Sequence, residues 1–224
     1  MDIAPQITEA HVKNYLNQNP QFFENHPDLL AIMFLPSPHG NGTVSLAERQ
    51  QLAQREKIRA IEQKFSELLR NAQENDLISQ KIHQLCLSLI GCESFDEKIN
   101  KIIFSLSDDF QIPYTGIRIW TDAMNSEHMN HDVFKTVDIE LKNWAESLIE
   151  PYCGNKPGLD FNSWFGENSI PKSFALITLR TDKTFGLLAM ASDQDHRFYP
   201  EMGTLYLKRI GELISASLSK YILL

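Results

Sequence analysis

The stretch from Ser45 to Ile90 contains neither proline nor glycine, and the first glycine after it is Gly91. Proline and glycine disfavour a helix interior more than any other residues, so this stretch predicts one helix over residues 45–90. Ser45 followed by Glu48 has the spacing of a capping box, in which each side chain binds a backbone amide of the first turn. A helix of this length needs other elements to cover its apolar side, so the rest of the chain must be arranged around it.

Apolar residues recur along this helix in alternating steps of three and four, which is the spacing of a coiled-coil seam. The first set is Ile58, Ile61, Phe65, Leu68 and Ala72, and the second set is Ile78, Ile82, Leu85 and Leu89. Asn75 takes the seam position between the two sets, and the step of three that follows it is a stammer, which locally overwinds a coiled coil.

Such a seam needs a partner helix, either elsewhere in the chain or on a second copy. We expect a homodimer through the long helix, with all ten positions from Ile58 to Leu89 as its seam. Asn75 either sets the register of the two copies, as a single polar seam residue can, or faces solvent beside the stammer.

Residues 1–44 form the predicted N-terminal unit. Thr8–Asn19 has the pattern of a short helix, and Pro20 and Pro27 each stand where a further short helix can begin. This unit is too apolar to stand alone in water, so we expect it to dock on the long helix. Leu35–Gly42, with two prolines and two glycines, is the predicted linker.

Residues 91–224 carry the pattern of an α+β domain. The expected elements are a helix from Ser94, a strand at Tyr114–Thr121, a helix at Thr136–Glu150, a hairpin of Ser173–Arg180 with Thr184–Ala191, and a closing helix at Pro200–Leu223. Both runs of the hairpin are almost entirely apolar, which places them at the centre of a sheet that is covered on both faces. The predicted domain organisation is therefore 1–44, 45–90 and 91–224.

The order of these elements resembles that of a GAF-like domain. The end of the chain adds to the resemblance, since Phe185-Gly186-Leu187-Leu188-Ala189 leads through a small polar turn to Arg197-Phe198 and the last helix. The resemblance implies a GAF-like antiparallel sheet flanked by helices, preceded here by a small helical N-terminal unit and a long coiled-coil helix.

Several motifs spread over nearly the whole chain resemble a more specific family, the YigA-type bacterial proteins. They are Asn19-Pro20-Gln21-Phe22-Phe23, His26-Pro27-Asp28-Leu29-Leu30, Ser45-Leu46-Ala47-Glu48-Arg49-Gln50, Asn75-Asp76, Pro151-Tyr152-Cys153-Gly154 and Met202-Gly203-Thr204. This family is catalogued as a domain of unknown function, and its genes often lie beside one for a tyrosine recombinase. The resemblance implies a fold but no catalytic residues, and a GAF-like fold serves many functions.

Charge and cysteine content limit the functions to consider. The chain carries 21 Lys and Arg against 29 Asp and Glu, a formal net charge of −8, and no half of it forms the basic patch that phosphate contacts need. We therefore expect no direct nucleic-acid binding. Its three cysteines lack C-x-x-C spacing, Met1–Ala10 has no signal-peptide core, and the longest apolar run near the N-terminus is seven residues, Leu29–Leu35. These features predict a cytoplasmic protein with no membrane span.

Aromatic and arginine residues of the C-terminal domain are the candidate ligand site. They are Arg118, Trp120, Trp144, Tyr152, Cys153, Trp164 and Arg180. Together they could line a cavity for a small anionic or planar ligand, or the aromatics fill the core while the arginines extend from strand ends. The polar segment with Glu127, His128, His131 and Asp132 lacks a partner cluster, so we expect no metal and no cofactor.

Three functions follow from these patterns. The first is a non-catalytic GAF-like regulatory or sensory module for signalling, dimerised through the long helix, that binds a small ligand or a protein partner. The second is a ligand-free adaptor that recruits another protein through its N-terminal helices and coiled coil. The third is a thiol-based redox enzyme that uses Cys153, since some GAF-type enzymes reduce methionine sulfoxide with pocket cysteines.

Overall fold

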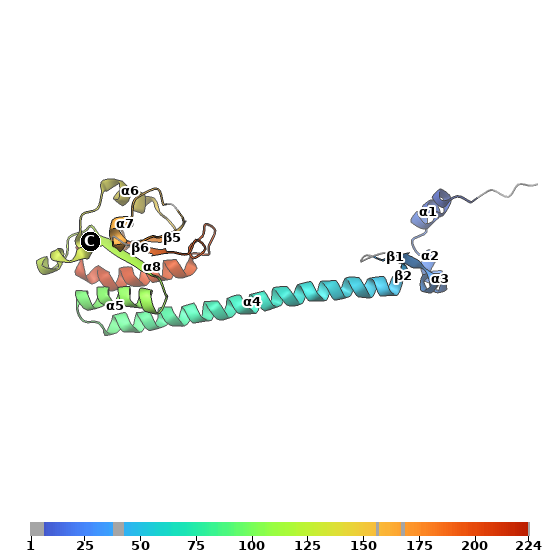
Figure 1. The fold of residues 1–224 in the computed structure, drawn as a ribbon, viewed down its shortest axis with the longest axis horizontal. Helices are drawn as coiled ribbons and strands as arrows, with labels where there is room; N and C mark the ends of the chain where they lie inside the picture. Colours follow the sequence, from blue (N-terminus) through green and yellow to red (C-terminus); the bar gives the residue numbers. More distant parts are fainter. Residues whose placement is uncertain (1–6, 38–42, 156, 167–168, 224) are drawn as a thin grey trace, which may run out of the picture. The chain divides into compact units, whose positions relative to one another are not determined.

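The fold is described from a computed structural model, which places residues 7–37, 43–155, 157–166 and 169–223 (Figure 1). The chain divides into two compact units, Met1–Asn71 and Ala72–Leu224, and each is described by itself. The predicted domain boundaries at residues 44 and 90 stay a prediction.

One helix, α4, runs from Leu46 to Gly91 without interruption. At 1.5 Å per residue its 46 residues extend for about 69 Å. The capping box is present, because the Glu48 amide donates to Ser45 Oγ at 3.3 Å and the Ser45 amide donates to Glu48 Oε2 at 3.0 Å. The long helix predicted over residues 45–90 is thus confirmed.

The first unit places three short helices and a strand pair before α4. The helices are α1 (Glu9–Gln18), α2 (Phe22–Asn25) and α3 (Pro27–Ile32), and the strands are β1 (Phe34–Pro36) and β2 (Thr43–Ser45). The prediction of a linker at Leu35–Gly42 is wrong for its first two residues, because Leu35 and Pro36 lie in β1 and pair antiparallel with Val44 and Thr43 of β2. Its remaining residues 38–42 lie outside the described part.

Among the described residues of the first unit, the expected docking of these helices on α4 is not seen. No residue of α1, α2 or α3 is buried. The α4 side chains Ile58, Ile61, Phe65 and Leu68 are likewise 53%, 56%, 59% and 65% exposed. Two separate apolar surfaces therefore remain open in this unit.

The second unit contains a four-stranded antiparallel sheet. Its strands are β3 (Tyr114–Ile119), β4 (Tyr152–Gly154), β5 (Ser173–Arg180) and β6 (Thr184–Ser192), and their order across the sheet is β3-β6-β5-β4. The predicted hairpin is confirmed as β5 and β6, which occupy the two central positions and pair Ala175 with Met190. All nine residues of β6 are buried, as expected for a strand covered on both faces.

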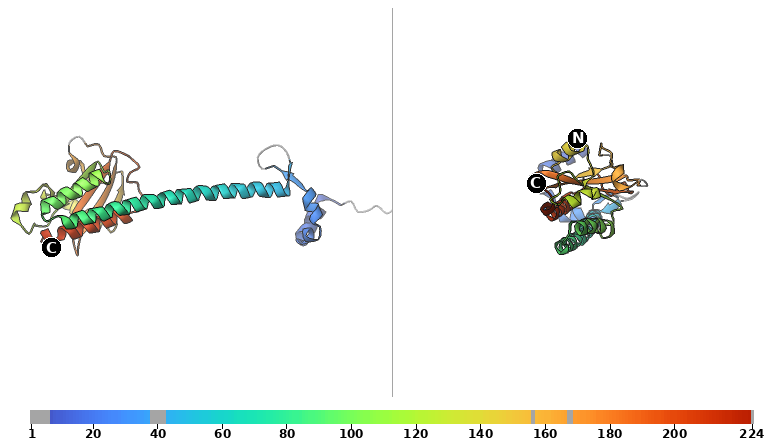
Figure 2. Two further views of the ribbon diagram at one scale, coloured as in Figure 1. Left: turned by 90° about the horizontal axis from the view of Figure 1, so that it is seen from below. Right: turned by 90° about the vertical axis from the view of Figure 1, so that its left-hand side faces the viewer.

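One face of the sheet packs against α5 (Phe95–Asp108), α8 (Leu205–Leu218) and the last turns of α4 (Figures 1 and 2). Leu85 and Leu89 of α4 are 1% and 2% exposed in this core. Two hydrogen bonds add to this packing. Tyr206 Oη of α8 donates to the Asn75 carbonyl of α4 at 3.2 Å, and Tyr221 Oη donates to the Glu93 carbonyl at 2.8 Å.

The buried Lys98 of α5 closes the C-terminal end of α4. Its side chain is 3% exposed, and its ammonium group donates to the Leu89 carbonyl oxygen. A positive charge is favourable at this position because the last carbonyls of a helix carry partial negative charge. The contact joins α4 to the same core that buries Leu89.

The other face of the sheet lies under α6 (Ile139–Ser147), α7 (Asn162–Phe165) and the segment around them. Single 3-10 turns occur at η1 (Ser126–Asn130), η2 (Asp132–Phe134) and η3 (Ser219–Tyr221). The closing helix, predicted at Pro200–Leu223, begins later, since Glu201 has a φ of 71° and a left-handed residue interrupts a helix. It also ends earlier, at Leu218, where the 3-10 turn η3 follows. The expected α+β architecture, a GAF-like antiparallel sheet flanked by helices, is otherwise confirmed.

Candidate functional site

The aromatic members of the predicted ligand site come together on the sheet face under α6 and α7. Trp120, Trp144, Tyr152 and Trp164 all pack against one apolar cluster there. The Trp144 ring lies 6.0 Å from that of Tyr152, and the Phe161 ring lies 5.2 Å from that of Trp164. The indole Nε1–H of Trp120 donates to the Thr184 carbonyl at 3.1 Å, so this N–H already has a hydrogen-bond partner within the protein.

Arg118 is a half-buried cation on this face. Its guanidinium carbon lies 5.0 Å from the ring centre of Trp164, a cation–π contact, and one of its N–H groups donates to the Ile117 carbonyl at 2.8 Å. Burial lowers the pKa of Arg118, while the negative charge of Asp132 opposes this change. The Asp132 carboxylate itself pairs with Lys135 at 3.0 Å. A guanidinium has five N–H donors, and the Ile117 carbonyl takes one of those of Arg118, so donors remain for another acceptor.

Gly116 lets the α7 segment lie directly on the sheet. A Cβ at this position would lie 3.1 Å from Trp164 Cβ and 3.2 Å from the Trp164 carbonyl oxygen. Side chains therefore fill the space over β3 closely. This packing agrees with the alternative in which the aromatics belong to the core.

Arg180 and Cys153 lie apart from this cluster. Arg180 is exposed at the end of β5 and donates to the Leu148 carbonyl at 2.9 Å. The Cys153 side chain packs against the core on the opposite face of the sheet, because alternate residues of a strand point to opposite faces. Burial raises the pKa of the Cys153 thiol from 9.0 to about 11.

The histidine segment forms a packing cluster. The buried Phe95 ring lies 5.0 Å from His128 and 5.8 Å from His131, and His131 Nδ1 accepts a hydrogen bond from the Val133 amide at 3.2 Å. Among the described residues, no group of three His, Cys, Asp or Glu side chains is placed to hold a metal ion.

The expected dimer seam separates into two parts with different surroundings. Ile78 and Ile82 pack partly against the core of their own chain, and Leu85 and Leu89 are buried in it. A seam between two copies that includes Leu85 and Leu89 is therefore not compatible with this core, whose α5 and α8 already cover them. The apolar stripe that stays exposed, called the α4 stripe below, consists of Ile58, Ile61, Phe65 and Leu68.

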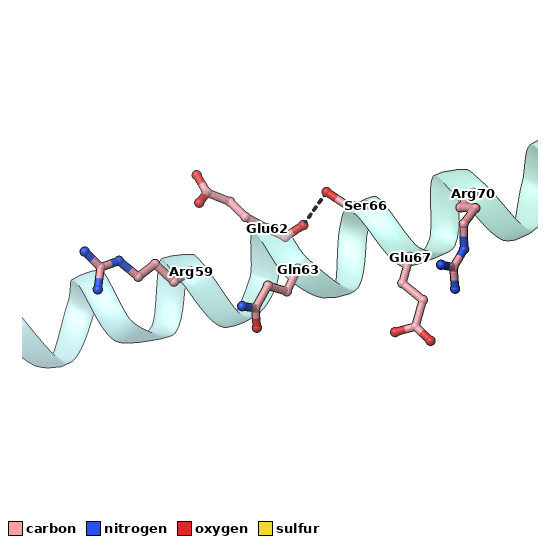
Figure 3. A pocket seen from close by; sticks show the side chains of 6 residues that line it. All are labelled: Arg59, Glu62, Gln63, Ser66, Glu67 and Arg70. Atoms are coloured by element: carbon pink, nitrogen blue, oxygen red, sulfur yellow. Dashed lines mark hydrogen bonds between the residues drawn. The ribbon is translucent and has the colours of Figure 1, made fainter.

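Polar side chains occupy the adjoining surface of the same helix. Figure 3 shows six of them, Arg59, Glu62, Gln63, Ser66, Glu67 and Arg70. Ser66 Oγ donates to the Glu62 carbonyl at 2.9 Å. Because all six belong to α4, the hollow between them has a single wall and does not enclose a ligand. The α4 stripe is thus one apolar side of an amphipathic helix.

Fold and site together define the class of protein, an α+β protein of GAF-like architecture with an exposed amphipathic helix before the sheet. The chain belongs to the family described as "Protein of unknown function, DUF484", whose profile matches residues 3–223. The resemblance to YigA-type proteins is confirmed as well. The chain is 22% identical over 225 residues to "Uncharacterized protein YigA" of Salmonella typhimurium, covering 97% of this chain and 93% of the relative. It is also 22% identical over 221 residues to the YigA protein of Escherichia coli K12, with the same coverage.

Solved structures similar to this chain include two GAF domains. One is from a phosphoenolpyruvate-protein phosphotransferase of Coxiella burnetii, with 11% identity, a TM-score of 0.49, and coverage of 64% of this chain and 93% of that one. The other is from the Acinetobacter phosphoenolpyruvate-protein phosphotransferase, with 12% identity, a TM-score of 0.48, and coverage of 63% and 92%. Among the described residues, no helix has the length and hydropathy that crossing a bilayer requires.

Proposed function

We propose that this protein is a non-catalytic regulatory module that acts as a homodimer, in which the α4 stripe joins two copies and the GAF-like domain responds to a ligand or a protein partner. The observation that carries the proposal is the exposure of the stripe. Four large apolar side chains at coiled-coil spacing are each more than half exposed, on a helix whose far end is built into a domain core.

The free energy expected from burying this stripe fits a reversible dimer. Fully burying one such side chain is worth about 1.5–3 kcal/mol, so burying what remains exposed is worth about 1 kcal/mol or somewhat more for each. Eight such side chains meet in a pair, which gives about 10 kcal/mol. Association costs of about 4–15 kcal/mol offset much of this gain. The difference is at most about 6 kcal/mol, so we expect a weak dimer with a dissociation constant of roughly tens of micromolar.

The charges beside the stripe favour a parallel pair. With Ile58 and Phe65 at heptad position a, Lys57 and Lys64 take position g and Glu62 takes position e. In a parallel pair g faces the following e of the partner, so Lys57 meets Glu62 of the second copy. An antiparallel pair would instead bring lysine positions together, which is unfavourable.

The burial of Leu85 and Leu89 offers a way for the GAF-like domain to influence the pairing of two copies through α4. A change in the packing of α5 or α8 acts on the last turns of α4, because these two leucines belong to the same core. α4 continues without a break to the α4 stripe. A ligand or partner that alters this core would therefore act on the helix that pairs the copies.

The ligand has one candidate anchor, the half-buried Arg118 stacked on Trp164, which suits an anionic or planar group. The close filling of the same face favours the second candidate function, the ligand-free adaptor. A thermal-shift screen against nucleotides and anionic metabolites separates the two, since a ligand stabilises the folded state it binds. A shift that is lost in Arg118→Met supports the sensor, and no shift in any condition supports the adaptor.

The raised pKa of Cys153 weighs against the redox alternative. A thiol with a pKa of about 11 is almost entirely protonated at neutral pH, whereas the thiolate is the nucleophile. Its side chain also lies on the opposite face from the aromatic cluster.

Disulfide trapping tests the parallel dimer. The background carries Cys86→Ser, Cys92→Ser and Cys153→Ala, and single cysteines are then introduced as Ile58→Cys or Leu68→Cys. Partners at a or d positions of a parallel pair lie close enough to form a disulfide, so both variants should yield covalent dimers under mild oxidation.

Leu77→Cys is the matched control, because Leu77 is 57% exposed on α4 but outside the seam spacing. It should stay monomeric on a non-reducing gel. An antiparallel pair would trap at most one of the two stripe positions. No trapping at either position, with sedimentation of single chains at about 100 μM, would remove the proposal.

A further inference from the structure

The three helices of the first unit surround an open apolar groove of about 670 Å³. Six of the residues that line it are Val12, Tyr15, Phe22, Phe23, Leu29 and Ile32. Its walls are held by ring contacts, with Tyr15 5.8 Å from Phe22 and Phe22 5.3 Å from Phe23. The groove lies entirely within residues 7–33.

This groove takes the place of a closed core. Val12 is 48% exposed, Tyr15 53% and Ile32 68%, and no residue of the three helices is buried. Exposed apolar surface of this kind marks an interaction site when it is contiguous.

We propose that the groove binds an amphipathic α-helix of another protein, with lysine or arginine on the flanks of its apolar face. The inference is independent of the pairing of two copies through the α4 stripe.

The apolar lining of the groove favours a helical partner over an extended peptide. The lining side chains are apolar except for His11, whose Nδ1 already contacts the Thr8 hydroxyl at 3.1 Å, and the tyrosine hydroxyl of Tyr15. An extended peptide would leave its backbone N–H and C=O groups without partners in such a groove. A helix satisfies these groups internally and presents side chains at i, i+3, i+4 and i+7.

The acidic balance of the segment that forms the groove favours a partner with basic flanks. Among residues 7–37 the charged side chains are Glu9, Glu24 and Asp28 against the single Lys13. Complementary charge raises the rate of association and disfavours acidic partners. The same acidic balance disfavours an anionic membrane surface, which attracts basic segments.

A fluorescence anisotropy titration of the full chain tests the proposal. The probe is a labelled peptide of about 18 residues, five helical turns, with leucine at i, i+3, i+4 and i+7 and lysine on both flanks. A second peptide has the same leucines and glutamate flanks. At low salt the lysine peptide should bind at least about tenfold more tightly than the glutamate peptide.

Matched variants test whether the peptide binds in the groove. Val12→Asp with Ile32→Asp alters two exposed groove positions and should weaken the lysine peptide at least about tenfold. The control, Ile139→Asp with Ile149→Asp, changes side chains that are 67% and 85% exposed elsewhere and should leave binding unchanged.

A second pair of variants tests the charge. Glu24→Lys with Asp28→Lys should remove the preference for the lysine peptide. Glu140→Lys with Glu146→Lys makes the same change in net charge on α6, and should preserve it.

Two results would overturn the proposal. One is equal binding of the lysine peptide to the groove variant and to its control, which would indicate general attraction to an acidic chain. The other is absence of lysine-peptide binding to the unmodified chain. A loss of dimer in the groove variant would then identify a second copy as the occupant. Disulfide trapping through Ile58→Cys and Leu68→Cys reports on the α4 stripe itself, so failure of the peptide titration is distinct from failure of the dimer through the stripe.

Discussion

Replacing Leu68 by alanine should weaken the dimer without unfolding the chain. Leu68 is 65% exposed in the single chain, so its only large loss on truncation is the contact with a second copy. Alanine has a higher helix propensity than leucine, which keeps α4 intact. The variant therefore isolates the contribution of one seam position.

The magnitude follows from the exposed fraction. Full burial of a leucine is worth about 1.5–3 kcal/mol, so the exposed part of Leu68 is worth about 1–2 kcal/mol in each copy. The pair loses about 2–4 kcal/mol, which raises the dissociation constant of the dimer roughly 30- to 700-fold.

Sedimentation equilibrium over a concentration series measures this constant. Leu77→Ala is the control, since it makes the same truncation at a side chain that is 57% exposed on the same helix. It should leave the dissociation constant unchanged. Equal effects of the two substitutions would refute the assignment of the α4 stripe as the contact between copies.

Three further outcomes are expected. Leu89→Ala should lower the free energy of unfolding by about 2–5 kcal/mol in urea denaturation, whereas Leu87→Ala, at a side chain 51% exposed, should change it by less than about 0.5 kcal/mol. Gly116→Ala should cost about 1–3 kcal/mol because its Cβ meets Trp164, while Gly91→Ala, with open space around it, should be neutral or slightly stabilising. The folded pKa of Cys153 lies above the ordinary value of 9.0, so the folded state holds its proton longer and the unfolding free energy should fall as the pH rises from 9.0 to about 11. Cys153→Ala should lack this part of the pH dependence, and equal pH profiles of the two proteins would contradict the assignment.

Local patterns predicted the elements of this fold well. The capping boxes at Ser45 and Ser94 both form, and β3 alternates as expected, with Ile117 and Ile119 in one core and Arg118 on the other face. These features depend on residues near one another in sequence, which is why they can be read from spacing alone.

Long-range packing was harder to predict. The sequence shows two apolar sets on α4 but not that α5 and α8 cover only the second, since both sets have the same periodicity. Trp144 and Trp164 could be grouped as aromatics, but whether they enclose a cavity or fill it depends on the path of the segment over the sheet. The role of Lys98 cannot be predicted from the sequence, because a buried lysine bound to a carbonyl has no sequence signature.

The burial of Leu85 and Leu89 also limits how the protein can be divided for study. A fragment that starts at residue 91 would remove both leucines and the Asn75 carbonyl that accepts a hydrogen bond from Tyr206. It would leave apolar surface of α5 and α8 open to water, and aggregation would follow. A truncation placed near Ala72 retains these partners and keeps the second compact unit whole, so it suits binding measurements on the C-terminal half.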